Sequence, residues 1–201
     1  MTRGWPMELS DGDLLIRPLS ASDGRMWSEV RRRNMAWLTP WDATSPPEAA
    51  EQPPTYRQMV RHLRHEAREG RTMAMALVIG GRFAGQITLG GISWGSLRSA
   101  YIGYWIDEAY AGRGYMPRAV AMVSDYAFFR LGLHRLEINI RPENEASIRV
   151  AEKLGFRYEG MRRRYLHIAG DWRDHQTYAL CVDEVPHGVL AGVNERSRPL
   201  G

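Results

Sequence analysis

The chain has 201 residues, of which 44% are hydrophobic and 25% charged, an ordinary balance for a soluble globular protein of one domain. No apolar run approaches the roughly 20 residues that cross a bilayer, and the first residues lack the apolar core of a signal peptide. The single cysteine, Cys181, excludes an internal disulfide and suits a reducing compartment. We therefore expect a cytoplasmic protein with no membrane partner.

The net charge of +4 comes from 27 Lys and Arg residues against 23 Asp and Glu residues. Part of the excess lies in two arginine runs, 31–33 and 162–164, which we interpret as solvated faces. We expect no direct contact with nucleic acid. The sign of the charge also suits a cofactor with several phosphates, or a substrate mounted on a ribonucleoprotein.

The first third of the chain predicts one strand and two helices. Ser22 or Asp23 can cap the first helix, and Gly70 stands where a C-cap would end the second. An aromatic-rich loop and a proline-rich segment separate the two helices. In chain order, the strand, helix, loop, proline-rich segment and helix span residues 14–19, 22–33, 34–42, 43–54 and 56–69.

Strands dominate the next part of the chain. Gly80-Gly81 is a strong hairpin signal between two apolar runs, and Gly90-Gly91 suggests a bulge or bend inside the second run. Three antiparallel strands are predicted, over 72–79, 82–92 and 100–106. A Gly112-Arg-Gly114 turn follows them and leads directly into a helix that stops near Gly132.

The last third predicts a helix between short strands. The predicted elements are strands over 134–140, 156–158, 164–168 and 176–182, a helix over 145–154 and a hairpin turn over 169–171. This order indicates a single α+β domain around a mixed sheet. We place the domain at residues 14–183, between an N-terminal segment, 1–13, and a polar C-terminal tail, 184–201.

The Gly112-Arg-Gly114 turn is typical of an anion site. The first turn of a helix has free N–H groups and the positive end of a dipole, and glycine lets the main chain approach a phosphate closely. A dinucleotide-binding turn is one alternative, but its third glycine would stand where the chain has Pro117. A tight turn without a ligand is the other alternative.

Several segments in fixed order resemble the GCN5-related N-acetyltransferase (GNAT) superfamily, and within it the RimJ-type protein N-terminal acetyltransferases. The resemblance extends from about Leu14 to Asp183. Its motifs lie at 104–106, 110–115, 131–137, 144–156, 158–160 and 170–174. Ala109 and Ala111 depart from the family, which often has Gln or Arg there. The turn would therefore bind chiefly through its main chain, with Arg113 or Arg118 adding positive charge.

The resemblance implies acetyl-CoA as the cofactor and a mixed, mostly antiparallel sheet flanked by helices, with two central strands that splay apart around the coenzyme. The first of these strands ends at Ile106. The turn would hold the pyrophosphate, and a side-chain amide at the start of the next helix would reach the pantetheine arm. The cofactor-binding residues so implied are Trp105, Ile106, Gly112, Arg113, Gly114, Tyr115, Met116 and Asn144.

Two residues are candidates for catalysis. Ser147 stands on an apolar helical face, and the resemblance implies that it stabilises or protonates the departing thiolate; the alternative is a hydrogen bond to a main-chain carbonyl of the preceding turn. Glu159 is, by resemblance, the general base, acting directly or through water. The alternative is a rim carboxylate paired with an arginine of 162–164. An α-amine, with a pKa of roughly 7.7–8, needs only modest help from a base, whereas a lysine amine near ~10.4 needs much more.

Aromatic residues are the candidates for substrate binding. Trp37 and Trp41, in the aromatic-rich loop, are predicted to form one wall for the acceptor, and Tyr165 and Trp172 the opposite wall. Alternatively, the tryptophans plug the end of the sheet.

Two further expectations concern metals and the route of transfer. His134 and His167 lack metal-ligand spacing with other His or Cys residues, so we expect no metal. Cys181 is most simply a small core residue, and we therefore expect direct attack of the amine in a ternary complex rather than a covalent acetyl-enzyme.

The sequence thus predicts an acetyl-CoA-dependent N-acetyltransferase that acts on the N-terminal α-amine of a protein, with a ribosomal protein as one candidate. One alternative keeps the chemistry and changes the acceptor to a small amine, an antibiotic or a lysine side chain. Another is a non-catalytic module that binds acetyl-CoA and regulates a partner. The chain is expected to be a monomer or a homodimer.

Overall fold

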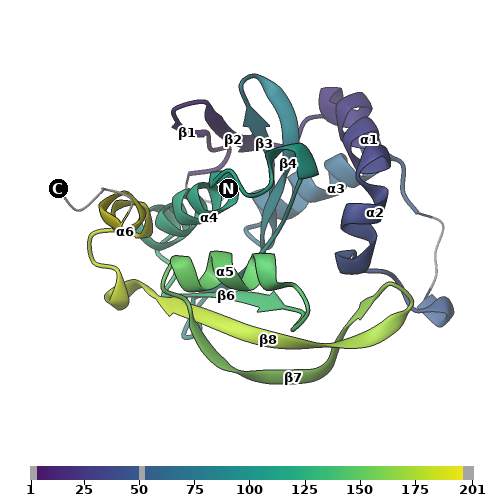
Figure 1. The fold of residues 1–201 in the computed structure, drawn as a ribbon. Coiled ribbons are helices and arrows are strands. Elements are labelled where there is room, and N and C mark those ends of the chain that lie inside the picture. Colours follow the sequence, from purple (N-terminus) through teal and green to yellow (C-terminus); the bar gives the residue numbers. More distant parts are fainter. Residues whose placement is uncertain (1–3, 50–52, 197–201) are drawn as a thin grey trace.

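A single eight-stranded sheet runs through the computed structural model, which describes residues 4–49 and 53–196. The strands are β1 (Leu9–Asp11), β2 (Leu14–Pro18), β3 (Met73–Ile79), β4 (Arg82–Ser93), β5 (Ser99–Ile106), β6 (Arg135–Ile140), β7 (Arg157–Ile168) and β8 (Asp171–Cys181). Their order across the sheet is β1-β2-β3-β4-β5-β6-β8-β7, and only β5 and β6 are parallel neighbours (Figure 1). The mixed, mostly antiparallel sheet that we predicted is confirmed.

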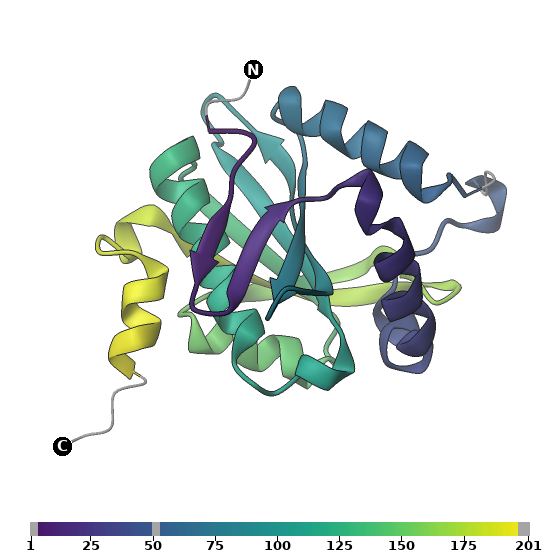
Figure 2. The same cartoon turned by 90° about the horizontal axis from the view of Figure 1, so that it is seen from above.

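Helices cover both faces of this sheet. They are α1 (Gly24–Arg33), α2 (Met35–Leu38), α3 (Tyr56–Arg68), α4 (Tyr115–Asp125), α5 (Glu145–Lys153) and α6 (Val189–Arg196). The first three lie on one side, and α4 and α6 lie on the other side (Figure 2). Within the described residues, no helix has the length and apolar character needed to cross a membrane.

Strand β3 shows why the central sheet is stable. All of its residues are buried, because helices pack on both of its faces. Met73, Met75 and Leu77 belong to the larger core, under α4. Ala74 and Ala76 belong to a smaller core beneath α1 and α3, which come close to the strand because these side chains are small.

Local signals in the sequence set several helix ends. Thr55 caps α3 by accepting a hydrogen bond from Gln58 N, and the Gln58 side chain accepts one from Thr55 N. Helix α4 continues as a π-helical turn to Leu131 and ends at Gly132, whose φ of 74° favours glycine. The predicted stop near Gly132 is therefore confirmed.

The chain has ordered structure on both sides of the predicted domain, 14–183. Within residues 1–13, β1 pairs with β2, so the sheet begins before Leu14. Within the predicted polar tail, 184–201, α6 packs on α4, and Asp125 accepts hydrogen bonds from the N–H groups of Val189 (2.6 Å) and Leu190 (3.1 Å). Residues 1–3 and 197–201 lie outside the described residues.

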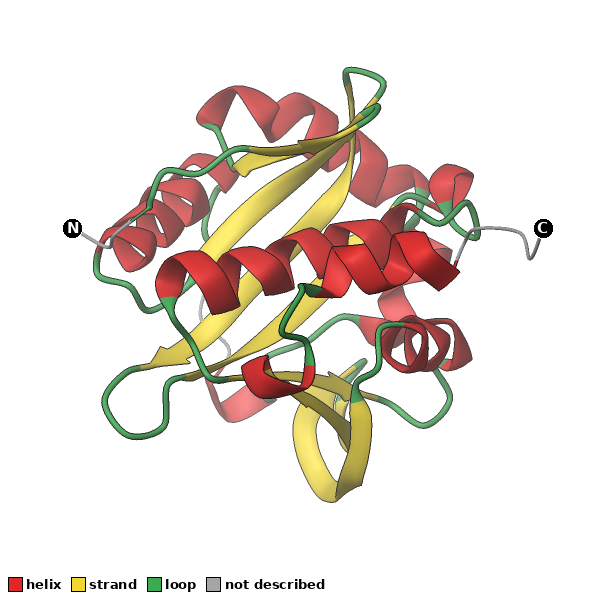
Figure 3. Cartoon of the chain, turned by 90° about the vertical axis from the view of Figure 1, so that its left-hand side faces the viewer, coloured by secondary structure: helices red, strands yellow, loops and turns green. Residues whose placement is uncertain are grey.

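The end of the chain differs most from the predicted elements. The predicted strands at 156–158 and 164–168 are one strand, β7, in which register shifts after Tyr158 and Arg162 absorb extra residues. Strand β8 starts at Asp171 rather than at Gln176. Together they form a long curved hairpin, which lies at the lower edge of Figure 3, and its tip pairs with the chain after α2 through Ile168 and Ala43. In the predicted aromatic-rich loop, 34–42, the chain forms α2 and a short 3-10 turn.

Candidate active site

The sheet opens between its two parallel strands. Strand β5 pairs with β4 along its length, and β6 pairs with β8, but β5 and β6 pair with each other only from Ser99↔Arg135 to Tyr101↔Glu137. Beyond these positions the strands part, and the main-chain groups that face the gap lack a partner strand. The splayed central strands that we predicted are therefore present.

A pocket of about 410 Å³ lies at this opening. Its residues come from β5, from β6 and the connection to α5, from the first turn of α5, from the β7–β8 hairpin and from the chain after α2. They are Trp41, Ala43, Tyr101, Ile102, Gly103, Tyr104, Ile138, Asn139, Ile140, Arg141, Asn144, Ser147, Tyr165, Leu166, Ile168 and His175. Asp and Glu are absent from these lining residues.

Two hydroxyl groups meet in the pocket. The Tyr104 hydroxyl is buried, and its neighbour, the Ser147 hydroxyl, is not placed in good hydrogen-bond geometry, so no described residue satisfies it. Burial raises the pKa of Tyr104 to about 12, and the hydrogen-bonding interaction with Ser147 opposes this rise. No bond from Ser147 Oγ to a main-chain carbonyl is found within the described residues, so the local alternative for this serine has no support. An unpaired buried donor of this kind suits an acceptor atom brought by a ligand.

Asn144 holds the start of α5 in place. Its Oδ1 accepts a hydrogen bond from Ser147 N at 3.1 Å, which is an N-cap, and the residue lines the pocket. The Asn144 Nδ2 group makes no hydrogen bond with the described residues and stands free beside the parted strands.

The glycine turn stands at the C-terminal end of β5, the end at which the strands part. Gly112 (φ 73°) and Gly114 (φ 81°) both adopt the left-handed conformation, and a Cβ at either position would meet open space. Gly114 is the N-cap of α4, and no side chain caps this helix. The first N–H groups of α4, including those of Tyr115 and Met116, are therefore available to a phosphate.

The side chains around the turn differ in whether they already have interaction partners. Arg118 binds Asp11 at 2.7 Å, whereas Arg113 has no ion-pair partner in the part of the chain described. The Tyr115 hydroxyl donates to Asp13 Oδ2 at 2.6 Å, and Met116 is buried in the core. Of the two predicted cations, only Arg113 is thus uncommitted.

Three predicted residues lie beside the pocket without lining it. Trp105 packs on Phe83, with the ring centroids 6.0 Å apart, and the Arg31 guanidinium lies 5.3 Å from the Trp105 centroid. The Ile106 carbonyl accepts a hydrogen bond from Trp37 Nε1 at 3.2 Å. Trp37 therefore links α2 to the end of β5. This placement agrees with the alternative that the tryptophans plug the end of the sheet.

Each predicted aromatic pair contributes one residue to the pocket. Trp41 lines it, with the Arg141 guanidinium 5.5 Å from its ring centroid. Tyr165 lines it from the hairpin. Trp172 is 44% exposed and packs edge-on against His167 instead, with the ring centroids 5.6 Å apart. Trp41 and Tyr165 are therefore the better placed pair for an acceptor.

Glu159 lies outside the pocket and is held by two arginines. Its carboxylate oxygens lie 2.5 Å from Arg135 Nη2 and 3.1 Å from Arg157 Nη2. The hydrogen bond from Arg135 is the main cause that lowers the pKa of Glu159, which makes it a weaker base. These contacts argue against Glu159 as the general base and favour the alternative, a carboxylate paired with arginine. Its partners are Arg135 and Arg157 rather than the arginines of 162–164.

Sequence reasoning missed His175, a pocket residue whose side chain can carry a proton. It is 4% exposed, its Nδ1 lies 3.1 Å from the main-chain carbonyl of Arg173, and its ring centroid lies 5.5 Å from that of Tyr165. Because β8 was expected to start at Gln176, His175 fell outside the predicted strand. Alternation along a strand that starts at Asp171 would have placed it on the same face as the buried Thr177.

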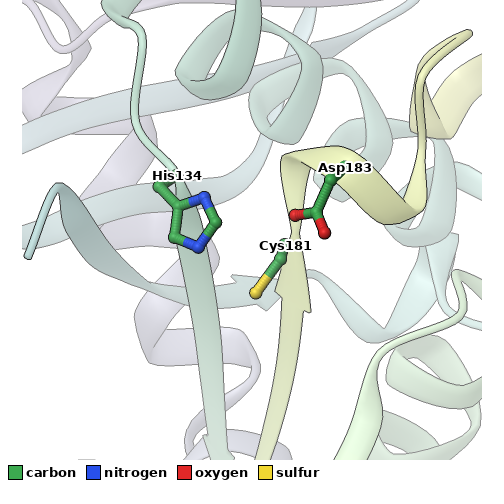
Figure 4. Close-up of side chains that lie close together, drawn as sticks. All are labelled: His134, Cys181 and Asp183. Carbon is green, nitrogen blue, oxygen red and sulfur yellow. The ribbon is translucent and has the colours of Figure 1, made fainter.

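A second group of polar side chains lies at the opposite end of β6 and β8. One ligand atom each of His134, Cys181 and Asp183 lies within 4.8 Å of the others (Figure 4). Spacing along the chain did not reveal this group, because β6 and β8 are distant in sequence. His134 and Asp183 are exposed. That the chain binds no metal stays a prediction.

Known proteins share this fold and parts of the sequence. Residues 13–157 match the family model described as the acetyltransferase (GNAT) domain. The chain is 46% identical over 99 residues to the probable N-acetyltransferase YjcK of Bacillus subtilis, and 36% identical over 90 residues to the ribosomal protein uS5-alanine N-acetyltransferase of Escherichia coli. These matches cover 49% and 45% of the chain, and they span only about half of each relative, 55% and 46% of its length.

Among solved structures, that of Mycobacterium smegmatis RimJ in complex with CoA-disulfide superposes with a TM-score of 0.92 at 34% identity, over 98% of both chains. The family match spans most of the sheet, the glycine turn and α5, the elements that build the opening between β5 and β6. This chain therefore belongs to the GNAT acetyltransferase family.

Proposed function

We propose that this protein transfers the acetyl group of acetyl-CoA to the N-terminal α-amine of a protein. The observation that carries the proposal is the pocket at the parted strands, where the unpaired Tyr104 hydroxyl and Ser147 lie on one side and the aromatic residues Trp41 and Tyr165 stand at its rim. The RimJ structure of M. smegmatis contains CoA-disulfide, which supports a coenzyme A ligand for the same fold here.

The residues around the opening fit coenzyme A. The uncapped N–H groups at the start of α4 suit its diphosphate, and Arg113 adds an uncommitted positive charge. The unpaired main chain of β5 and β6 beyond Tyr101 and Glu137 suits the amides of the pantetheine arm. Acetyl-CoA would supply the activated thioester. Ser147 and Tyr104 would then donate hydrogen bonds, and one of them a proton, where the sulfur acquires charge.

The composition of the pocket favours a peptide α-amine over a polycation. Polyamines and aminoglycoside antibiotics carry several positive charges, which a binding site must neutralise. No carboxylate belongs to the pocket lining, and Arg141 adds a positive charge there. A single amine at the end of an otherwise uncharged segment avoids this conflict, and the aromatic rim offers apolar contact to that segment.

The route of transfer is direct. Cys181, the single cysteine of the chain, lies at the far end of β8 and does not line the pocket. Attack by the amine in a ternary complex therefore accounts for transfer without an acetyl-enzyme. A ribosomal protein is the first acceptor to test, because the E. coli relative is named as a ribosomal protein uS5-alanine N-acetyltransferase.

A panel of acceptors tests the proposal. The protein would be incubated with acetyl-CoA and peptides that begin with alanine or serine, the same peptides with a blocked N-terminus and an internal lysine, spermidine, and an aminoglycoside. Release of the free thiol gives the rate, and fragmentation mass spectrometry locates the acetyl group. We expect acetylation of the α-amine.

Two outcomes would contradict this expectation. Faster transfer to the lysine, spermidine or antibiotic would replace the acceptor by a side chain or small amine. Tight acetyl-CoA binding without transfer to any acceptor would favour the non-catalytic module.

A further inference from the structure

One ring nitrogen of the pocket residue His175, Nε2, is free to accept a proton. The main-chain carbonyl of Arg173 can only accept a hydrogen bond, so Nδ1 of the ring carries the hydrogen. Nε2 of the neutral ring then keeps its lone pair. No hydrogen bond reaches Nε2 from the described residues, although the side chain is 4% exposed and lines the pocket.

We propose that His175 is the general base of acetyl transfer, and that its Nε2 takes the proton from the acceptor ammonium group. This inference rests on the proposed function and deepens it. The ring is held in place by its hydrogen bond to Arg173 and by the Tyr165 ring, at 5.5 Å. Its strand is in register with β6 through Gln176↔Ile140, so the base stands on a rigid element.

The base and the hydroxyl pair come from different sides of the pocket. Ser147 is on α5, which lies above β6 in Figure 1, whereas His175 is on the β7–β8 hairpin, which lies below β6. Tyr104 enters from β5. An amine bound in this pocket would therefore lie between a proton acceptor, His175, and the proton donors Ser147 and Tyr104.

The surroundings keep the ring neutral. Burial lowers the pKa of His175 below its ordinary value of 6.5, and the positive charge of Arg141 adds to this effect. The bond to Arg173 and the charges of Glu143 and Asp174 oppose it. The cross-strand neighbour Arg162 is engaged elsewhere, with Glu137 at 2.6 Å and with the ring of Tyr165. A neutral imidazole near pH 7 is ready to accept a proton.

Acetyl transfer exchanges a C–S bond for a C–N bond and moves two protons from the acceptor nitrogen. One proton of the acceptor ammonium moves to Nε2, and the freed lone pair forms a C–N bond with the acetyl carbon. The C–S bond breaks, and its electron pair leaves on sulfur. The second proton that the nitrogen loses, or its equivalent from the Ser147–Tyr104 pair, ends on the thiol. The imidazolium returns its proton to water.

The two kinds of amine differ in how readily they give a proton to the same base. Transfer of a proton to the same imidazole is roughly 300-fold less favourable from a lysine ammonium, with a pKa near 10.4, than from an α-ammonium, with a pKa of about 7.7–8. The ratio does not depend on the pKa of His175. Direct proton transfer to His175 therefore favours an α-amine, the acceptor of the proposed function, by this same ratio.

The test compares His175→Gln with the wild type on a peptide α-amine. We expect kcat near pH 7 to fall by about 10²-fold, the usual size for a lost general base, with unchanged affinity for acetyl-CoA and unchanged Tm. The deficit should shrink above about pH 8, where the α-amine is already neutral in water. Nitrogen-detected NMR of the wild type should show the Nδ1–H form and a pKa below 6.5 for this ring.

His134→Gln is the matched control, because His134 is an exposed histidine at the other end of β6. It should leave kcat and its pH profile unchanged. If the wild type is active and His175→Gln keeps its full turnover, His175 is not the base, and the proposed function still stands. A deficit that is equal at every pH would lead to the same conclusion. No wild-type turnover with any amine would instead contradict the proposed function, and the base with it.

Discussion

The two ends of the β6–β8 strand pair both carry polar side chains, which are in opposite states. At the first end, which we call the ion-pair end, Arg135 bridges Glu137 and Glu159, and Arg157 bridges Glu159 and Glu184. At the pocket end, formed by Tyr104, Ser147 and His175 with the adjoining glycine turn, the Tyr104 hydroxyl and the Nε2 atom of His175 make no hydrogen bond with the described residues. The two ends therefore differ in whether contacts within the fold already satisfy each polar group.

This difference identifies the groups that are free to react. A carboxylate bound by two guanidinium groups must break those contacts before it can accept a proton, and its pKa is lowered. An unpaired hydroxyl or imidazole in a buried pocket has no such contact to lose, and it is tolerated where a ligand supplies the missing partner.

Ser147→Ala should give the largest loss of activity at the pocket end. If this hydroxyl stabilises or protonates the leaving thiolate, its removal should lower kcat by about 10²-fold. The affinity for acetyl-CoA should change little, because the main-chain N–H of residue 147 still bonds to Asn144. Steady-state kinetics and calorimetric titration with acetyl-CoA separate the two effects, and an unchanged kcat would return Ser147 to a packing role.

Gly114→Glu should weaken binding of acetyl-CoA. The side chain would enter open space at the start of α4 and place a negative charge where the diphosphate is expected, besides straining a backbone with φ of 81°. We expect KM for acetyl-CoA to rise roughly tenfold or more, equivalent to about 1.4 kcal/mol, with a smaller change in kcat.

Gly80→Glu is the control for the turn. Gly80 also has a positive φ, of 54°, and open space around it, but it lies in the β3–β4 hairpin. Gly80→Glu should strain the backbone but leave the KM for acetyl-CoA unchanged. Equal KM values for the two variants would remove the glycine turn from the coenzyme site.

Tyr104→Phe should lower turnover while raising stability. The buried Tyr104 hydroxyl has no partner in the described structure, so its removal should relieve a desolvation cost of roughly 1 kcal/mol. Turnover should fall several-fold if the hydroxyl contacts the ligand. Thermal unfolding without ligand, measured beside kinetics, checks both signs. A lower Tm would mean that the hydroxyl is already satisfied.

The predictability of the fold follows the range of the contacts that determine it. The buried run of β3 and the stop at Gly132 follow from neighbours in sequence. Strand β1 is only three residues long and is defined by its pairing with β2, and α6 depends on Asp125, more than sixty residues earlier. The bulges of β7 depend on pairing with β8, which no pattern within β7 displays. Contacts between distant segments are therefore what local patterns omit.

The site shows the same limit. Asn144, Ser147 and the glycine turn could be found because short motifs carry them, and the structure places them around the parted strands. Glu159 was predicted as the general base by resemblance alone. Its ion pair with Arg135 joins residues that are 24 positions apart in the sequence. His175 was missed because its role depends on a pocket that five separate segments build.

Glu159→Gln should have the smallest effect on activity and a measurable effect on stability. Since Glu159 does not line the pocket, kcat should stay within about twofold, far from the 10²-fold expected of a lost base.

The pKa of Glu159 is lowered in the folded state, so the ion pair stabilises the fold fully above the ordinary value of 4.5 and loses this contribution as the pH falls through the lowered value. The pair is partly exposed and screened, which limits the contribution to about 1 kcal/mol or less. Denaturant unfolding of both proteins should thus show a gap near neutral pH that closes in acid. A gap that persists in acid would mean that the glutamine disturbs packing, and a kcat loss comparable to that of His175→Gln would restore Glu159 as the base.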